Sequence, residues 1–310
     1  MLRFIGRRVV LMLLSLWVIA TLTFVLMKCI PGDPFTSEKK YPPQTIANLK
    51  AEYGLDKSIP EQYVTYITNL AKFDLGFSIN NTSRTVNEML SDSFPVSAEL
   101  GAYSVLLALC AGVLMGITAA LWQNRLPDYV MMILAVIGIS VPSFVLAPFL
   151  QKYFGLEWKI LPLAGWGDPP QIILPAAALA LGQVALIARL MRSSMLDVVT
   201  QDYIRTARAK GLPPWRVISR HTLRNAIIPV VTIMGPAIAA VLTGSFVIEK
   251  IFSIPGMGKY FVESITNRDY PVIMGTTIFY ASFLIMMNLL VDLTYGWIDP
   301  RIKVGGREGR

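Results

Sequence analysis

Six long stretches of apolar residues alternate with polar segments along the chain. An α-helix needs about 20 predominantly apolar residues to cross roughly 30 Å of hydrocarbon, and inside a bilayer it satisfies all of its own backbone hydrogen bonds. The stretches therefore predict membrane-spanning helices. Their expected limits are residues 9–29, 98–121, 129–150, 172–192, 227–249 and 272–297. The pattern predicts an all-α integral membrane protein that begins with an N-terminal anchor helix over residues 1–30.

Residues 31–97 form the one large polar segment, and they contain three signals for the start of a helix. Pro42-Pro43 precede an apolar pattern that includes Ile46. Ser58 with Glu61, and Thr85 with Glu88, have the spacing of capping boxes. We expect a small helical subdomain on the outer side of the membrane. It either merely covers the ends of the spans or has a role of its own.

Small residues and prolines modify the predicted spans. Small residues four positions apart let helices approach closely in lipid, and prolines remove a backbone donor and bend a helix. The small pairs are Gly112/Gly116, Ala178/Gly182, Gly235/Ala239 and Ala240/Gly244, and the prolines are 142, 148, 175, 229 and 236. The pattern predicts a packed bundle with bent members, suited either to a static bundle or to a cavity that opens alternately to both sides.

Lysine and arginine set the expected orientation, because positively charged loops resist translocation. With six spans, both termini share one side with the loops at 122–128 and 193–226. These regions hold more than half of the 28 basic residues: Arg3, Arg7, Arg8, Arg125, Arg189, Arg192, Arg205, Arg208, Lys210, Arg216, Arg220, Arg224, Arg301, Lys303, Arg307 and Arg310. We expect this side, including the tail at 298–310, to be cytoplasmic.

Composition supports a membrane protein and limits its chemistry. Apolar residues make up 54% of the 310 residues, charged residues only 15%, and the mean hydropathy is +0.53. The net charge of +8 follows from topology, so nucleic-acid binding is not needed to explain it. Cys29 and Cys110 fall in or beside separate spans and suggest neither a disulfide framework nor a metal site. No cluster of a nucleophile with a base, metal motif or phosphate-binding loop is visible, so we expect no catalysis, metal or cofactor in this chain.

The segment from Gln201 to Pro214 carries the most specific pattern. Leu196, Val199, Tyr203 and Ala207 step by three or four residues, which predicts one apolar helical face at the membrane surface. Gly211 can take the left-handed conformation that ends a helix, and Pro213-Pro214 prevent its continuation. The pattern predicts either a docking helix or a basic helix attracted to anionic lipid.

Here the chain resembles the permease subunits of ATP-binding-cassette importers, in their oligopeptide and dipeptide branch. The family motif is Glu-Ala-Ala, three residues, Gly, nine residues and Ile-x-Leu-Pro; Ala207, Gly211 and Leu223 match it, while Arg205-Thr206 and His221 depart from it. The departures resemble the peptide branch, close to Thr-Ala-Arg-Ala-Lys-Gly-Leu followed by Arg-His-x-Leu-Arg. Further matching motifs are Pro31-Gly32-Asp33-Pro34, Phe94-Pro95-Val96-Ser97, Ile254-Pro255-Gly256-Met257-Gly258 and Asn267-Arg268-Asp269-Tyr270-Pro271.

The resemblance implies a fold of the type I importer kind, with a five-helix permease core over 98–297 and a coupling loop at 193–226. It implies a bacterial cytoplasmic membrane location and an assembly with a homologous second permease subunit, two ATP-binding cassette ATPase subunits that hold ATP and Mg, and an extracytoplasmic peptide-binding protein. The implied ATPase-coupling residues are Tyr203, Arg205, Thr206, Ala207, Arg208, Ala209, Lys210 and Gly211.

Candidates for a substrate pathway or gate are Gln183, Glu249, Pro255, Gly256 and Asn288. Gln183 and Asn288 lie within spans and have amides suited either to a peptide backbone or to a neighbouring helix. Glu249, Pro255 and Gly256 belong to an outer loop that the resemblance makes a lining or gate element.

Two classes of transporter and a static scaffold remain as alternatives. Importers of nickel or glutathione belong to the same branch. An ion-coupled secondary transporter normally has ionisable sites near the midplane of the membrane, and charges within these spans are scarce. Neither a secondary transporter nor a scaffold needs a helix stopped by glycine in its cytoplasmic loop.

Overall fold

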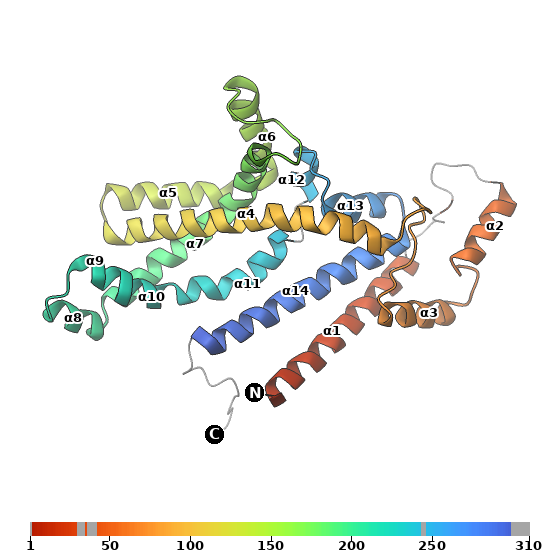
Figure 1. The fold of residues 1–310 in the computed structure, drawn as a ribbon, viewed down its shortest axis with the longest axis horizontal. Helices are drawn as coiled ribbons and strands as arrows, with labels where there is room; N and C mark the ends of the chain where they lie inside the picture. Colours follow the sequence, from red (N-terminus) through yellow and green to blue (C-terminus); the bar gives the residue numbers. More distant parts are fainter. Residues whose placement is uncertain (1, 30–34, 36–41, 243–245, 299–310) are drawn as a thin grey trace.

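A computed structural model describes residues 2–29, 35, 42–242 and 246–298, and in these ranges the chain is helical (Figure 1). The elements are α1 (Leu2–Cys29), α2 (Pro43–Glu52), α3 (Ile59–Ala71), α4 (Val86–Leu121), α5 (Leu126–Ser140), α6 (Ser143–Leu150), the π-helix η1 (Gln151–Glu157), α7 (Pro169–Val199), α8 (Asp202–Ala209), α9 (Pro214–Arg216), the π-helix η2 (Val217–Thr222), α10 (Leu223–Ala226), α11 (Ile228–Leu242), α12 (Phe246–Ile251), α13 (Met257–Thr266) and α14 (Tyr270–Ile298). The motif at residues 31–34 and the tail from residue 299 lie outside the described residues.

Among the residues that the structure describes, four helices are long and apolar enough to cross a membrane, namely α1, α4, α7 and α14. A fifth crossing is formed if α5 and the segment Ser143–Glu157 count as one bent span. The fifth expected span, 227–249, corresponds to α11, which is described over 15 residues, and to the start of α12; residues 243–245 between them lie outside the described residues. Within the described residues, each expected apolar stretch is occupied by helices.

The third expected span, 129–150, is not one straight helix. It breaks after Ser140, and the two halves meet at 105°. Pro142 is the N-cap of α6 and takes an extended conformation (φ −58°, ψ 140°), which ends the preceding helix and starts the next in a new direction. The expectation that Pro142 bends its span is confirmed, and the bend is large enough to turn α6 away from α5.

The core of the bundle is the contact between α4 and α7. Buried Ala108, Ile187, Met191 and Met195 belong to one apolar cluster there. A Cβ added to Gly116 would lie 2.5 Å from Cβ of Met191 and 2.7 Å from the Ala188 carbonyl oxygen, so only glycine permits this approach. Gly112 is equally confined by Ile187. The small pair predicted from spacing is therefore the close contact between these two helices.

The described part of the segment 31–97 contains helices, and α4 begins at Val86, before the expected start of the second span at residue 98. Both capping boxes are present: Ser58 with Glu61 begins α3, and Thr85 with Glu88 begins α4. The helix that starts at Val86 continues without a break to Leu121, with Pro95 inside it. The last part of the polar segment is thus the outer extension of the second span, because nothing after Thr85 stops the helix.

Asp269 connects the loop before α4 to the start of α14. Its carboxylate is buried and accepts hydrogen bonds from the Ser78 hydroxyl and from the backbone N–H groups of Ile79, Asn80 and Val272.

The segments α8 to α10 and α2 to α3 lie at opposite ends of the bundle (Figure 1).

Candidate functional site

The helix α8 is a short, separate helix rather than a continuation of α7. The preceding helix ends at Val199, and Gln201 caps α8 in an extended conformation. The expected continuous face through Leu196, Val199, Tyr203 and Ala207 is therefore wrong. The break at Thr200 and Gln201 rotates α8, so that Ile204 and Ala207 become its buried positions and Tyr203 stays exposed.

The stop after α8 agrees with the sequence prediction. Gly211 has φ +75°, in the left-handed region, and open space surrounds the position of its absent Cβ. The Gly211 N–H donates to the Arg208 carbonyl at 2.9 Å, and the Leu212 N–H donates to the Ala207 carbonyl at 3.4 Å. These two bonds form a Schellman motif, which satisfies the last carbonyls of the helix.

One side of α8 is anchored to the rest of the protein. Ile204 is fully buried against Val217 of η2, together with Ala207, and Val198 and Leu212 pack around them. The Asn225 amide donates to the Tyr203 hydroxyl at 2.7 Å. The orientation of α8 is thus fixed by an apolar contact and by a tie to α10.

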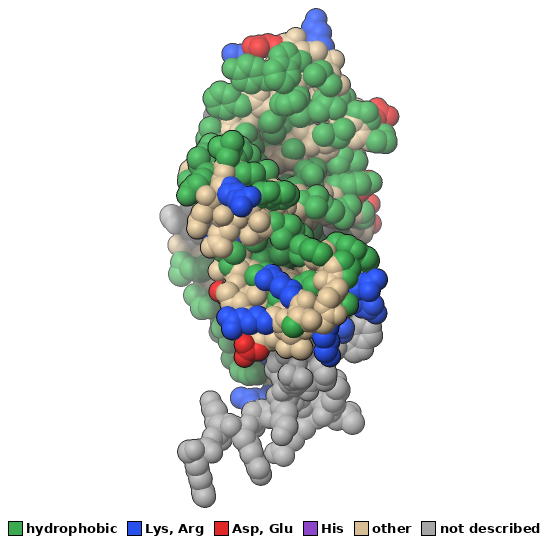
Figure 2. Space-filling view, turned by 90° about the vertical axis from the view of Figure 1, so that its left-hand side faces the viewer, with side chains coloured by type: hydrophobic (Ala, Val, Ile, Leu, Met, Phe, Trp, Pro, Cys, Tyr) green, Lys and Arg blue, Asp and Glu red, His purple; other side chains and the backbone are tan. Residues whose placement is uncertain are grey.

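The other side of α8 is exposed and predominantly basic. The exposed predicted coupling residues are Tyr203, Arg205, Thr206, Arg208, Ala209, Lys210 and Gly211. Arg205 and Asp202 approach only to 3.8 Å in an open setting, where an ion pair contributes little to stability. Figure 2 looks onto this end of the molecule and shows Lys and Arg side chains across it, with few acidic ones. Helix α8 is therefore held in place on one side and presents a basic face on the other, which suits contact with another protein.

A second set of candidates lies in the loop from Glu249 to Gly258. The Glu249 carboxylate is 1% exposed and accepts hydrogen bonds from the Ser97 hydroxyl (2.8 Å) and the Gly258 N–H (2.8 Å). The Ser97 oxygen also accepts from the Met257 N–H at 2.8 Å. A Cβ on Gly256 would lie 2.5 Å from both Glu249 Oε2 and Ser97 Oγ. The loop is therefore folded tightly around one buried carboxylate.

The remaining pathway candidates are not gathered into one site. Gln183 faces a small space between α4, α7 and α11, and its Oε1 is buried without a hydrogen-bond partner. Asn288 is half-buried on α14, and Pro255 is exposed. Among the residues that the structure describes, no hydrogen bond joins Gln183, Glu249 and Asn288. The predicted pathway set stays a set of separate positions in this chain.

Sequence reasoning missed two polar contacts that position these elements. Arg192 of α7 forms a bidentate ion pair with Asp128 of α5, both N–O distances being 2.6 Å, and Asp128 also accepts from the Asn124 N–H. The second contact joins Ser97 to Glu249, and the sequence indicated Ser97 only as part of the motif Phe94-Pro95-Val96-Ser97. An aspartate after a proline at the start of an apolar run is the signal that identifies Asp128 as a helix-start acceptor.

The comparisons with known proteins agree on one family. Residues 112–304 match the family model described as binding-protein-dependent transport system inner membrane component, and residues 1–101 match the model for the N-terminal part of such membrane components. The chain is 54% identical to a dipeptide transport system permease protein of Bacillus subtilis (strain 168), over 98% of this chain and 99% of that one. It is 45% identical to an oligopeptide transport system permease protein of Salmonella typhimurium, over 98% of this chain and 100% of that one.

A solved structure shares the fold. The crystal structure of an amino acid ABC transporter with histidines superposes with a TM-score of 0.53 at 14% identity, covering 67% of this chain and 93% of that one. This likeness shows a shared helical fold.

Proposed function

Because the chain belongs to the family of inner membrane components of binding-protein-dependent transport systems, we propose that it is one of two membrane subunits of an ATP-driven peptide importer. The relatives named above are permease proteins for dipeptides and oligopeptides. The observation that supports a coupled transporter most directly is α8, which is anchored through Ile204 and Ala207 and exposes a basic face.

In the proposed assembly, the chain forms half of the translocation pathway and a homologous subunit forms the other half. Two partner ATPases bind ATP and Mg and contact α8. Their closure pushes on α8, and the force reaches the bundle through η2 and α10, which connect directly to α11. A peptide-binding protein docks at the opposite end, near α2, α3 and the loop 252–258.

The proposed orientation places both termini and α8 in the cytoplasm and residues 42–85 outside. It rests on the basic residues around α8. Single cysteines at Asn80 and at Lys210, in a background with Cys29 and Cys110 replaced, test it with an impermeant thiol reagent applied to intact cells. Asn80 and Lys210 are both exposed. Labelling at Asn80 alone is expected, and equal labelling at Lys210 contradicts the orientation.

The energy source is tested with the complete complex in proteoliposomes. Uptake of a radiolabelled dipeptide is expected only when ATP and Mg reach the side that carries α8 and the binding protein is present on the other. Uptake sustained by a proton or sodium gradient without ATP would contradict the proposal and indicate a secondary transporter.

The role of α8 is tested with two glycines that both have a positive φ and open space around them. Gly211 and Gly167 both have positive φ, +75° and +129°, and neither has an atom within 4 Å of the position of its absent Cβ. A valine at either site costs about 1–3 kcal/mol of backbone strain. We expect Gly211→Val to lose most dipeptide uptake and to weaken recovery of the ATPases, while Gly167→Val keeps both. Normal uptake and ATPase recovery in Gly211→Val would contradict the coupling role.

A further inference from the structure

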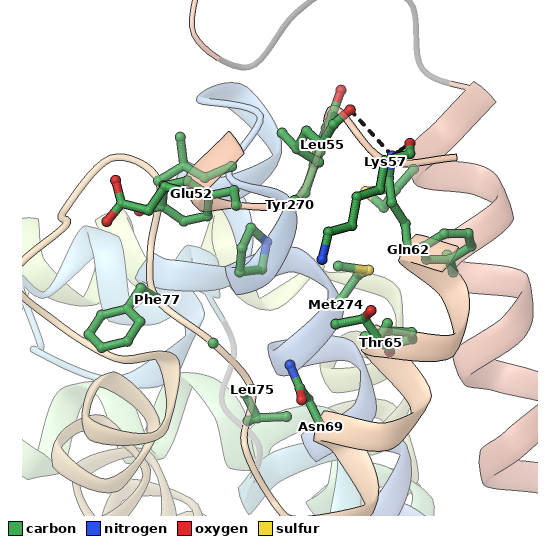
Figure 3. A pocket seen from close by; sticks show the side chains of 18 of the residues that line it. Glu52, Leu55, Lys57, Gln62, Thr65, Asn69, Leu75, Phe77, Tyr270 and Met274 are labelled. Atoms are coloured by element: carbon green, nitrogen blue, oxygen red, sulfur yellow. Dashed lines mark hydrogen bonds between the residues drawn. The ribbon is translucent and has the colours of Figure 1, made fainter. Parts of the chain in front are cut away.

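A cavity lies at the end of the bundle opposite α8, where two membrane spans terminate (Figure 3). Its volume is about 450 Å³, within the range of small-molecule sites. Its walls come from the end of α1, the end of α2, the loop 53–57, one face of α3, the segment 74–82 and the first turn of α14. Segments far apart in sequence therefore enclose it, and neither the proposed coupling segment nor the loop around Glu249 takes part.

One side of this cavity is rich in hydrogen-bond donors. Lys57 and Asn69 direct their side chains into the same space in front of Met274 (Figure 3). A Cβ placed on Gly54 would lie 3.8 Å from Cδ of Lys57, so the lysine stem folds along this glycine into the cavity. Lys28 of α1 also lines the cavity, and its ammonium group donates to the Oε1 of Gln62. Two lysines and an amide therefore belong to the lining of this one cavity.

The acidic groups in the lining do not neutralise this region. Asp74 accepts a hydrogen bond from the Gly76 N–H at 2.9 Å, which holds its carboxylate to its own loop. The Glu52 carboxylate lies across the opening and points away from Lys57 (Figure 3). Tyr66 stays neutral, because burial raises the pKa of its hydroxyl to about 12. The inner side of the cavity is therefore suited to an anion.

The opposite wall is apolar. Leu75, Tyr270, Pro271 and Met274 form it, and Phe24 and Met27 of α1 close the base. A ligand that fills the cavity therefore combines an anionic group with apolar atoms.

The position of the cavity along the membrane normal identifies the ligand. Lys28 stands in the last turn of the apolar span Gly6–Cys29, and Tyr270 begins the span Tyr270–Leu290. The ends of membrane spans lie at the level of the lipid head groups, where lysines meet phosphates. Lipid phosphates are concentrated in this layer, whereas a soluble anion reaches the cavity only from dilute solution.

We propose that this cavity binds the head group of a phospholipid through its phosphate, with Lys57, Lys28 and Asn69 as the polar contacts and the Met274 wall against the glycerol and upper acyl carbons. The bound lipid joins α1 and α3 to α14. This proposal does not depend on the transported substrate.

The test compares the complete complex, reconstituted in vesicles of phosphatidylethanolamine and phosphatidylglycerol, in the wild type and in two variants. Lys57→Met removes the cation that enters the cavity, and the nearly isosteric Asn69→Asp places a negative charge beside the phosphate. Lys72→Met is the matched control, because Lys72 is an exposed lysine at the end of α3 and does not line the cavity. After mild extraction, native mass spectrometry counts the phospholipids that remain bound.

We expect the occupancy of one bound phospholipid to fall roughly fivefold in Lys57→Met, the factor that a single basic residue contributes at a membrane surface. Asn69→Asp is expected to lose it as well, and Lys72→Met to keep it. Wild-type occupancy in both cavity variants overturns the proposal.

A second experiment adds glycerol phosphate or a dipeptide to the wild-type complex. Displacement of this lipid by either soluble molecule at millimolar concentration overturns the assignment to a lipid and identifies a soluble ligand.

Discussion

The loop 249–258 and helix α8 differ in how their polar groups find partners. In the loop 249–258, the buried Glu249 and Ser97 accept or donate every hydrogen bond described above within the chain itself. In α8, the buried contacts are apolar, and the charged groups Arg205, Arg208 and Lys210 face outward. The buried polar groups of the loop 249–258 thus have hydrogen-bond partners within the chain. The charged side chains of α8 face outward, where a partner protein can contact them.

The difference concerns how each loop keeps its shape. A buried polar network is costly when one member is lost, since the remaining groups stay buried without a partner. An exposed basic face costs little to change in the isolated subunit. Substitutions are therefore expected to affect folding at the loop 249–258 and assembly at α8.

The largest effect on stability is expected from Gly258→Val. A Cβ at this position would lie 2.4 Å from Cα of Phe246, and backbone yields less readily than a side chain. Overpacking of this kind costs about 3 kcal/mol. Thermal unfolding of the purified protein in detergent measures it, with Gly6→Val as the comparison at an open helical site without positive φ. Equal unfolding temperatures for the two variants would show that the loop 249–258 is not tightly packed.

The next effect is expected from Ser97→Ala, which leaves the Met257 N–H and one Glu249 oxygen without their partner. Each buried group left unsatisfied costs about 1–3 kcal/mol. Ser104→Ala is the matched control on the same helix, because the Ser104 hydroxyl donates only to the Leu100 carbonyl one turn earlier. Both serines are buried. If the two alanine variants unfold alike, the network around Glu249 contributes no more than an ordinary helical serine.

A moderate effect of a different kind is expected from Ile204→Ala and Arg208→Glu. Removing the buried Ile204 side chain leaves a cavity beside Val217, so α8 loosens locally while the rest of the bundle stays folded. Arg208→Glu leaves the stability of the subunit within about 0.5 kcal/mol, as for other exposed positions. Both are expected to reduce recovery of the ATPases with the complex. Undiminished recovery with Arg208→Glu would remove the basic face from the proposed contact.

The smallest effect concerns the start of α3. The Ser58 hydroxyl and N–H donate to the Glu61 carboxylate and hold its pKa below the ordinary value. A lowered pKa means that this stabilisation is present above the unfolded value of about 4.3 and is lost as the pH falls through the folded value. Hydrogen exchange at the first turn of α3, corrected for the intrinsic pH dependence, is expected to quicken below about pH 4. Glu61→Gln cannot titrate, so persistence of the change in that variant would assign it to another group.

Local features of the fold were predictable from the sequence because they depend on neighbours in the chain. The capping boxes at Ser58 and Thr85, the bend at Pro142 and the left-handed stop at Gly211 were all expected and are present. Each follows from contacts within about four residues. The same reasoning failed at residue 97, where no local signal separates the polar extension from the span, and at Thr200, where the chain turns before α8.

The sequence by itself determined the apolar spans, the helix starts and stops and the basic character of the α8 loop, since hydrophobic period and capping chemistry are local. Only the tertiary structure decided which polar groups meet. Ser97 reaches Glu249 across 152 residues, Arg192 reaches Asp128 across 64, and Ser78 reaches Asp269 across 191. These pairings, like the cavity between α1, α3 and α14, depend on how helices pack against each other. That packing is set by the shapes of whole helix faces, as at Gly116 against Met191.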